Sequence, residues 1–332
     1  MKTRIDRPAC TLALLLLAFL AACGSGSAAP TASSASSEPA QDALRAFDYD
    51  SRASLDIKVE STEKRDGVTL QTLTYASPRG GRVPAALIVP DGPGPFAGML
   101  FLHGAPGTYE RMIPEAETLA RRGTVALLIN APFSRGAGSS PMTFDRRDYD
   151  NHVQLIVDLR RGVDLLLARP DVDPKRLGYL GRSFGAATGG LLAGIEKRIS
   201  AYVLVVGDGG PVSHVNGSND ADGPLHHMPK EQAESWLALM EPIESIRFIG
   251  RASPAHLLFQ NGRQDELVAP ADAKAYQEAG SEPKTIQWYD AGHKLNEQAV
   301  YDRHLWLAER LGIAKPEPLA EAGKAGLSAP RP

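Results

Sequence analysis

Short, continuous apolar segments recur along the middle of this 332-residue chain, and they constrain its fold more than any other feature. Strands buried on both faces need such segments, whereas strands with one exposed face alternate apolar and polar residues. The stretches between them have helical patterns, as in 110–122 and 148–169. This alternation predicts an α/β fold with helices flanking a mostly parallel central sheet. The predicted strands are 99–102, 125–129, 177–180, 202–206, 255–259 and 285–289.

Two earlier segments predict an antiparallel beginning to the sheet. Residues 68–75 and 83–89 are rich in strand-forming residues, and a Ser-Pro-Arg-Gly-Gly turn lies between them. A later stretch, about 208–250, is polar at first and helix-like over 230–246. We expect it to be a small cap inserted beside the functional site.

The first residues have the pattern of an export signal. Basic residues precede an apolar segment, 12–20, that is shorter than the roughly 20 residues needed to cross a bilayer. The following Leu20-Ala21-Ala22-Cys23 is similar to the lipobox of bacterial lipoproteins. We therefore expect residues 1–22 to be a lipoprotein signal peptide and Cys23 to carry lipid that anchors the protein to a membrane of the cell envelope. Ordinary cleavage at an Ala-rich site is the alternative.

The composition of the termini predicts the domain boundaries. Residues 23–50 are expected to form a flexible tether, 51–314 the folded domain and 315–332 a disordered tail. Cys10 would leave with the signal peptide and Cys23 would be lipidated, so no disulfide is expected.

The pentapeptide Gly181-Arg182-Ser183-Phe184-Gly185 follows one predicted strand and precedes a stretch of small residues. A nucleophilic serine on a sharp turn from strand to helix needs small residues two positions before and two after it. No other serine in the chain has glycine at both positions. Ser183 is therefore the candidate nucleophile.

A serine hydroxyl needs a histidine as base, and that histidine needs a carboxylate to orient it. Asp265 and His293 each come directly after a late predicted strand, where the carboxyl ends of parallel strands meet. Asp208 also follows a strand and is the main rival for the acid, with Glu266 and Asp290 weaker. Two other histidines, 256 and 304, lie in strand and helix patterns and are expected to be structural.

The tetrahedral intermediate of acyl transfer needs donors for its oxyanion. The Phe184 N–H is one candidate. The other should come from the loop 103–107, where Pro106 has no N–H, so Ala105 is favoured and Gly104 is next.

Other kinds of site are disfavoured. A net charge of −3 with dispersed Lys and Arg gives no basic face for nucleic acid. A metal site at His226 and His227, with His214 and Asp222 nearby, lacks a ligand spacing that would direct these side chains to one ion. The Ser/Gly-rich segment 134–140 lacks the Lys-Ser/Thr pair and the following helix start that a phosphate-binding P-loop has. It is expected to be a flexible loop beside the site, and no cofactor is expected.

The chain resembles an α/β-hydrolase of the dienelactone hydrolase and acetyl-xylan-esterase-like branch, near the prolyl-oligopeptidase-type peptidases. The resemblance covers about residues 55–311 and rests on FLHGAPG, RPDVDPKRLGYLGRSFGA, LLFQNGRQDELV and WYDAGHKLNEQAVYDRHLWL. It implies that Ser183, Asp265 and His293 form the triad and that the loop 103–107 holds the oxyanion. Dienelactone hydrolases proper use a cysteine where this chain has Ser183, so that substrate is not expected.

These observations support a lipid-anchored serine hydrolase of small carboxylic esters. Two alternatives stay open. One is an aminopeptidase or oligopeptidase of the prolyl-oligopeptidase type, acting on peptides. The other is a non-catalytic binding protein on a hydrolase scaffold.

Overall fold

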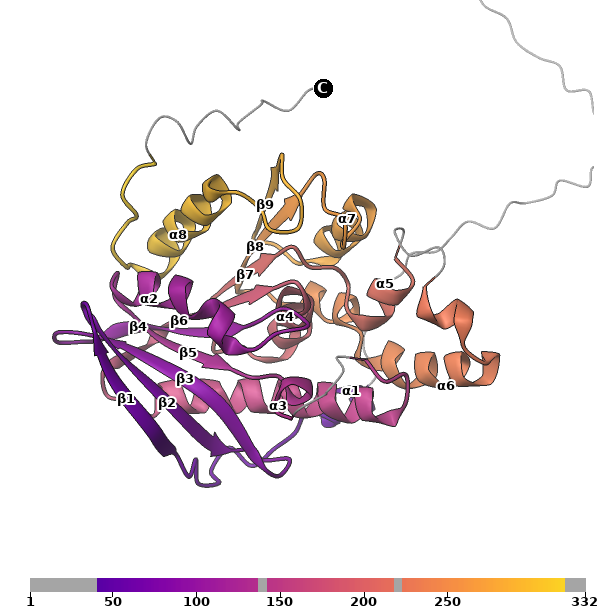
Figure 1. The fold of residues 1–332 in the computed structure, drawn as a ribbon, viewed down its shortest axis with the longest axis horizontal. Coiled ribbons are helices and arrows are strands. Elements are labelled where there is room, and N and C mark those ends of the chain that lie inside the picture. Colours follow the sequence, from indigo (N-terminus) through magenta and orange to yellow (C-terminus); the bar gives the residue numbers. More distant parts are fainter. Residues whose placement is uncertain (1–40, 137–141, 218–222, 320–332) are drawn as a thin grey trace, which may run out of the picture. The chain divides into compact units, whose positions relative to one another are not determined.

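A nine-stranded sheet runs through the centre of the protein in the order β1-β2-β3-β5-β4-β6-β7-β8-β9 (Figure 1). The computed structural model describes residues 41–136, 142–217 and 223–319, and structural statements below concern those residues. The strands are β1 (Lys58–Arg65), β2 (Val68–Ala76), β3 (Arg82–Pro90), β4 (Phe96–Leu102), β5 (Thr124–Ile129), β6 (Val172–Arg182), β7 (Ala201–Val205), β8 (His256–Gly262) and β9 (Lys284–Tyr289).

The predicted sheet is confirmed. Strands β1, β2, β3 and β5 pair antiparallel in turn, and β5, β4, β6, β7, β8 and β9 are parallel. Each of the predicted segments lies within one of these strands or overlaps it. Strand β1 was not predicted, because nearly all of its residues are exposed and it has no apolar pattern.

Helices cover both faces of the sheet. Alternate residues of β4 point to opposite sides: Leu100 and Leu102 face the core under α3 and α4, whereas Met99 and Phe101 face the core under α2 and α8. Figure 1 shows α3 on the side of the sheet opposite α2 and α8. The helices are α1 (Gln41–Arg45), α2 (Ile113–Ala120), α3 (Arg146–Leu167), α4 (Phe184–Ile195), α5 (Pro211–Val215), α6 (Lys230–Met240), α7 (Pro270–Ala279) and α8 (Glu297–Leu311).

The segment between β7 and β8, which we call the β7–β8 insertion, contains α5, α6 and several short 3-10 helices. In Figure 1 its helices lie at the end of the molecule farthest from β1. The helix predicted over 230–246 ends at Met240, and the chain continues as a short 3-10 helix, Glu241–Ile243, in which Pro242 has no N–H to extend the α-helical hydrogen bonds.

Both ends of the domain extend beyond the predicted boundaries. Residues 41–50, expected in the tether, include α1, and Phe47 is buried with its ring edge-on to Phe248 at 6.1 Å. At the other end Pro316 is buried, although the tail was expected to be disordered from residue 315. Ala43 and Phe47 belong to the main hydrophobic core, so apolar side chains hold the first of these segments in place. The expected signal peptide, residues 1–22, and Cys23 lie outside the described residues.

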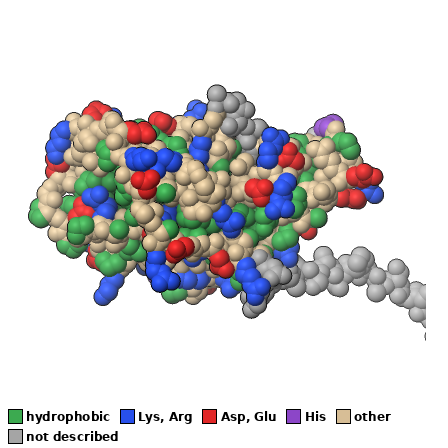
Figure 2. Space-filling view, turned by 90° about the horizontal axis from the view of Figure 1, so that it is seen from below, with side chains coloured by type: hydrophobic (Ala, Val, Ile, Leu, Met, Phe, Trp, Pro, Cys, Tyr) green, Lys and Arg blue, Asp and Glu red, His purple; other side chains and the backbone are tan. Residues whose placement is uncertain are grey.

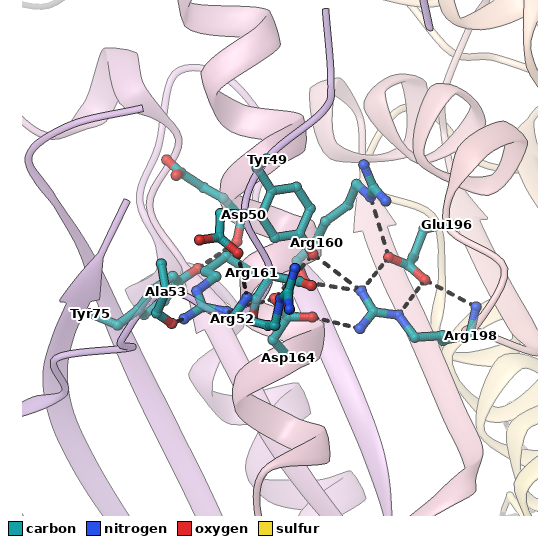
Figure 3. A network of polar contacts seen from close by, with 12 residues as sticks. Tyr49, Asp50, Arg52, Ala53, Tyr75, Arg160, Arg161, Asp164, Glu196 and Arg198 are labelled. Carbon is teal, nitrogen blue, oxygen red and sulfur yellow. Dashed lines mark hydrogen bonds and ion pairs between the residues drawn. The ribbon is translucent and has the colours of Figure 1, made fainter. Parts of the chain in front are cut away.

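A network of charged groups fixes the entering chain to α3 (Figure 3). Arg161 donates to the Ser51 carbonyl and to Asp164, both at 2.8 Å. The Tyr49 hydroxyl and Arg198 also donate to Asp164, at 3.0 and 2.5 Å. Arg161 is buried and its charge is compensated by Asp164, which also pairs with Arg198.

Basic and acidic side chains are interspersed on the face shown in Figure 2, without a continuous area of either charge. Within residues 41–136, 142–217 and 223–319, no helix combines the length and the apolar character that crossing a membrane requires.

Candidate active site

Ser183 occupies a sharp turn between β6 and α4. Its backbone has φ 53° and ψ −118°, a region that a residue with a side chain rarely adopts and that costs about 1–3 kcal/mol. The turn is held by hydrogen bonds from Ser183 N to Val205 O (2.8 Å) and from Ala187 N to Ser183 O (2.9 Å). The strain presents the serine above the end of the sheet, as predicted for a nucleophile elbow.

The two flanking glycines are required by close backbone contacts. A Cβ on Gly181 would overlap the carbonyl group of Gly185, and a Cβ on Gly185 would overlap the carbonyl group of Leu102. Alanine at either position would therefore push α4 away from β6 or β4. The Gly-x-Ser-x-Gly pattern is a packing requirement of this turn.

The loop after β4 lies against the serine. A Cβ on Gly104 would be 3.2 Å from Ser183 Cβ. The His103 ring holds the loop, because its Nε2 accepts from Ala131 N at 3.1 Å and its Nδ1 therefore donates to Gly104 O at 2.8 Å. Burial lowers the pKa of His103, which favours this neutral form. Ala105, the predicted donor, lines the same cavity as Ser183.

Phe184 is the first residue of α4. The N–H groups of the first helical turn have no acceptor within their own helix, and they form its positive end. The Phe184 N–H is therefore directed out of the helix beside Ser183, where an oxyanion would be stabilised.

Asp265 and His293 form a hydrogen-bonded pair. His293 Nδ1 lies 2.9 Å from Asp265 Oδ1 and 3.0 Å from Oδ2. Asp265 also accepts from the N–H groups of Leu267 and Val268, both at 2.9 Å. Burial raises the pKa of Asp265, but the hydrogen bonds from His293 and these two amides outweigh it, so the pKa is below its usual value. A buried, ionised carboxylate thus orients the imidazole.

Arg182 connects this pair to the serine. Its Nη2 donates to His293 O at 2.8 Å, so the loop that carries His293 is fixed to the residue directly before Ser183. Sequence reasoning did not identify this role, because Arg182 has no recognisable signal beyond its place in the pentapeptide.

The rival carboxylates have other partners. Asp208 lies 2.8 Å from His214 Nδ1 and accepts from Gly210 N. Glu266 accepts from the backbone N–H of His293 at 3.2 Å, and Asp290 forms an ion pair with Arg263. The structure thus pairs the His293 ring with Asp265.

A cavity of about 190 Å³ opens beside Ser183. Its wall combines Ala105 of the loop 103–107, residues of α3, the first turns of α4 and the β7–β8 insertion. The insertion supplies Asp208, Gly210, Pro211, His214, Trp236 and Met240. Most of the remaining wall is apolar, so the cavity suits a small organic group.

The disfavoured sites have no supporting geometry in the described parts of the chain. No group of three or more potential metal ligands occurs there. His226 and His227 lie on a short 3-10 helix, while His214 contacts Asp208. Asp222 and residues 137–140 of the Ser/Gly-rich segment lie outside the described residues.

Comparisons with known proteins agree with this fold. No family model matches the chain. Acetyl xylan esterase 1 from a Thermoanaerobacterium strain is similar in structure, with a TM-score of 0.67 and 17% identity over 80% of this chain and 92% of that one.

Two curated proteins are similar in sequence. Mouse mitochondrial acyl-coenzyme A thioesterase 2 is 27% identical over 65% of this chain and 49% of its own length. The uncharacterized peptidase YuxL of Bacillus subtilis is 26% identical over 68% of this chain and 36% of its own length. The chain thus spans half or less of the length of these relatives. Together with the sheet order and the elbow, the comparisons show an α/β-hydrolase fold.

Proposed function

We propose that this α/β-hydrolase cleaves small carboxylic esters through an acyl-enzyme on Ser183. The observation that carries the proposal is the Asp265–His293 pair, which Arg182 joins to a strained serine at the mouth of a cavity. Strained backbone conformations of this kind cluster at functional sites, and a purely structural serine has no reason to adopt one.

The reaction proceeds in two halves. His293 Nε2 takes the Ser183 proton while the serine oxygen attacks the ester carbonyl, and the Phe184 and Ala105 N–H groups stabilise the oxyanion. The imidazolium then gives its proton to the leaving alkoxide as the carbon–oxygen bond breaks. Water, activated by the same imidazole, hydrolyses the acyl-enzyme and restores Ser183. Asp265 stays ionised throughout and stabilises the imidazolium.

A thioester is the second candidate substrate, because the curated relative reported above is named a thioesterase. The same nucleophile, base and oxyanion donors serve both bonds. A peptidase would need in addition a group that binds the peptide amine or backbone, and the described residues do not single one out.

Covalent labelling with a fluorophosphonate tests the proposal directly. The wild-type protein should be labelled and should hydrolyse p-nitrophenyl butanoate, whereas Ser183→Ala should do neither. Labelling that persists in Ser183→Ala would refute the assignment. A parallel panel of thioesters and peptide p-nitroanilides ranks the alternative substrates and separates an enzyme from a non-catalytic binding protein.

We also propose that the protein is exported and anchored through lipid on Cys23, as the first residues predict. Metabolic labelling with a palmitate analogue should mark the wild-type protein in the membrane fraction and should not mark Cys23→Ser. Equal labelling of both would refute this.

A further inference from the structure

One polar side chain that lines the cavity beside Ser183 has no structural partner. Asn151 lies in the interior of α3 and borders the cavity, and it is partly exposed. Its amide forms no side-chain hydrogen bond with any residue that the structure describes. Because the side chain keeps accessible surface at the cavity, a molecule bound there can contact the amide.

The position of Asn151 on its helix directs it to the reacting end of the cavity. Asp148 and Leu155 lie three residues before and four residues after it, and both line the cavity, so the three share one stripe of α3. His152, the next residue, packs edge-on against the Phe184 ring with 5.8 Å between ring centroids. This part of α3 therefore lies next to the proposed nucleophile.

Neighbouring polar residues of α3 contribute to the structure in ways that Asn151 does not. Asp150 forms an ion pair with Arg146 at 3.0 Å. Gln154 donates to Gly80 O at 3.2 Å. Asparagine is also a poorer helix former than alanine or leucine, because its side chain competes for backbone hydrogen bonds. The amide of Asn151 is thus suited to contact with a bound molecule rather than to stability.

The charges around the cavity favour an uncharged partner for this amide. Asp148 and Asp208 line the cavity, and there is no Lys or Arg among the described residues of its wall. An anionic group would be repelled and would have no cation to pair with. Both carboxylates already accept hydrogen bonds within the protein, from Trp236 Nε1 at 2.8 Å and from Gly210 N at 3.2 Å respectively, so neither requires a cationic ligand.

We propose that Asn151 is a specificity-determining residue that hydrogen-bonds an uncharged oxygen of the substrate group held in the cavity, as a hydroxyl, an ether or a carbonyl. The amide can donate to any of these oxygens and can accept from a hydroxyl. This rests on the proposed function, and it holds whether the cavity takes the acyl group or the alcohol of the ester. A plain alkyl group would take water from the amide without replacing its hydrogen bonds, which disfavours that substrate.

The test compares isosteric esters in which an ether oxygen replaces one methylene, on each side of the ester bond. On the acyl side the pair is p-nitrophenyl methoxyacetate and p-nitrophenyl butanoate. On the alcohol side it is 2-methoxyethyl acetate and butyl acetate. Each ratio of kcat/KM is divided by the ratio for hydroxide-catalysed hydrolysis, which removes intrinsic reactivity. The wild-type protein should prefer the ether by about threefold or more in at least one pair, as expected for one net hydrogen bond.

Asn151→Leu nearly keeps the size of the side chain and removes the amide, so it should bring the preferred ratio close to one. The matched control is Gln154→Leu, which removes an amide from the same helix at a position that does not line the cavity. It should keep the wild-type ratio. A wild-type ratio near one in both pairs, an unchanged ratio in Asn151→Leu, or an equal fall in Gln154→Leu overturns the inference while leaving ester hydrolysis intact.

A binding measurement keeps the inference testable without catalysis. In Ser183→Ala, the preferred ether ester should raise Tm more than its alkyl isostere, and adding Asn151→Leu should remove the difference. Asn151→Leu alone should not lower Tm, because no intramolecular hydrogen bond is lost and leucine is the better helix former. Equal shifts with both esters, or a clear fall in Tm for Asn151→Leu, overturn the inference. Failure of the proposed function shows separately, as an absence of ester turnover and of fluorophosphonate labelling.

Discussion

Replacing Asp265 with asparagine tests the site most sharply, because the change keeps the shape of the side chain and alters only its charge and donors. In the structure Oδ1 accepts from Leu267 N and Val268 N, so the asparagine oxygen should take that position. The amide NH₂ then takes the place of Oδ2, 3.0 Å from His293 Nδ1, while the oxygen at the Oδ1 position stays 2.9 Å from the same nitrogen.

The substitution should therefore reverse the histidine tautomer. An NH₂ group donates to Nδ1, so the ring proton moves to Nε2, where it can no longer accept the proton of Ser183. A comparable change in a serine protease triad lowers kcat about 10⁴-fold, which corresponds to about 5 kcal/mol of transition-state stabilisation. We expect a loss of that order here, with the fold retained because the backbone hydrogen bonds of the loop survive.

The assay is kcat for p-nitrophenyl butanoate, with circular dichroism to check folding. The control is Asp290→Asn, which removes an exposed carboxylate from the loop that also carries His293 and should change kcat less than about threefold. If Asp265→Asn kept more than a tenth of wild-type activity while Asp208→Asn lost it, the assignment of the acid would be wrong.

Three further predictions concern stability. Gly185→Ala should lower Tm by roughly 10 °C or more, or prevent folding, because its Cβ overlaps the Leu102 carbonyl group; a thermal melt within a few degrees of wild type would contradict this. Asp164→Ala should lower the unfolding free energy by about 3 kcal/mol and Tm by roughly 6–12 °C, because it leaves the buried Arg161 without its carboxylate, whereas the exposed Asp150→Ala should have almost no effect. Burial raises the pKa of Glu244 to about 8. Between about pH 4.3 and 8 the folded protein therefore keeps a proton that the unfolded chain releases. The free energy of unfolding should fall as pH rises through this range. Glu244→Gln should flatten Tm against pH over this range, and an unchanged slope would refute the shift.

Much of the sheet could be predicted from the sequence because strands buried on both faces leave an apolar signal. Strand β1 could not, since its residues face water and carry charges. The nucleophile, acid and base candidates were found because each follows a strand, and the structure places the second and third within hydrogen-bonding distance of each other.

The remainder of the site left no such signal. His152 and Thr188 lie inside helices, where the pattern is that of core packing, and only the assembled structure shows that they border the cavity. Arg182 and His293 are more than a hundred residues apart in the sequence, so no local sequence pattern could predict the hydrogen bond between them.

The cavity is built from two kinds of segment, and this bears on how the protein could change over evolution. The proposed reacting groups sit on short loops at the ends of strands, in a rigid frame of sheet hydrogen bonds. The later part of the β7–β8 insertion packs into the core with Phe248 and Ile249, but its first part, up to Met240, supplies much of the cavity wall. Insertions, deletions or recombination there would alter what is accepted without disturbing the frame. A laboratory search for new substrate preferences should therefore concentrate its diversity between β7 and β8 and leave the elbow unchanged.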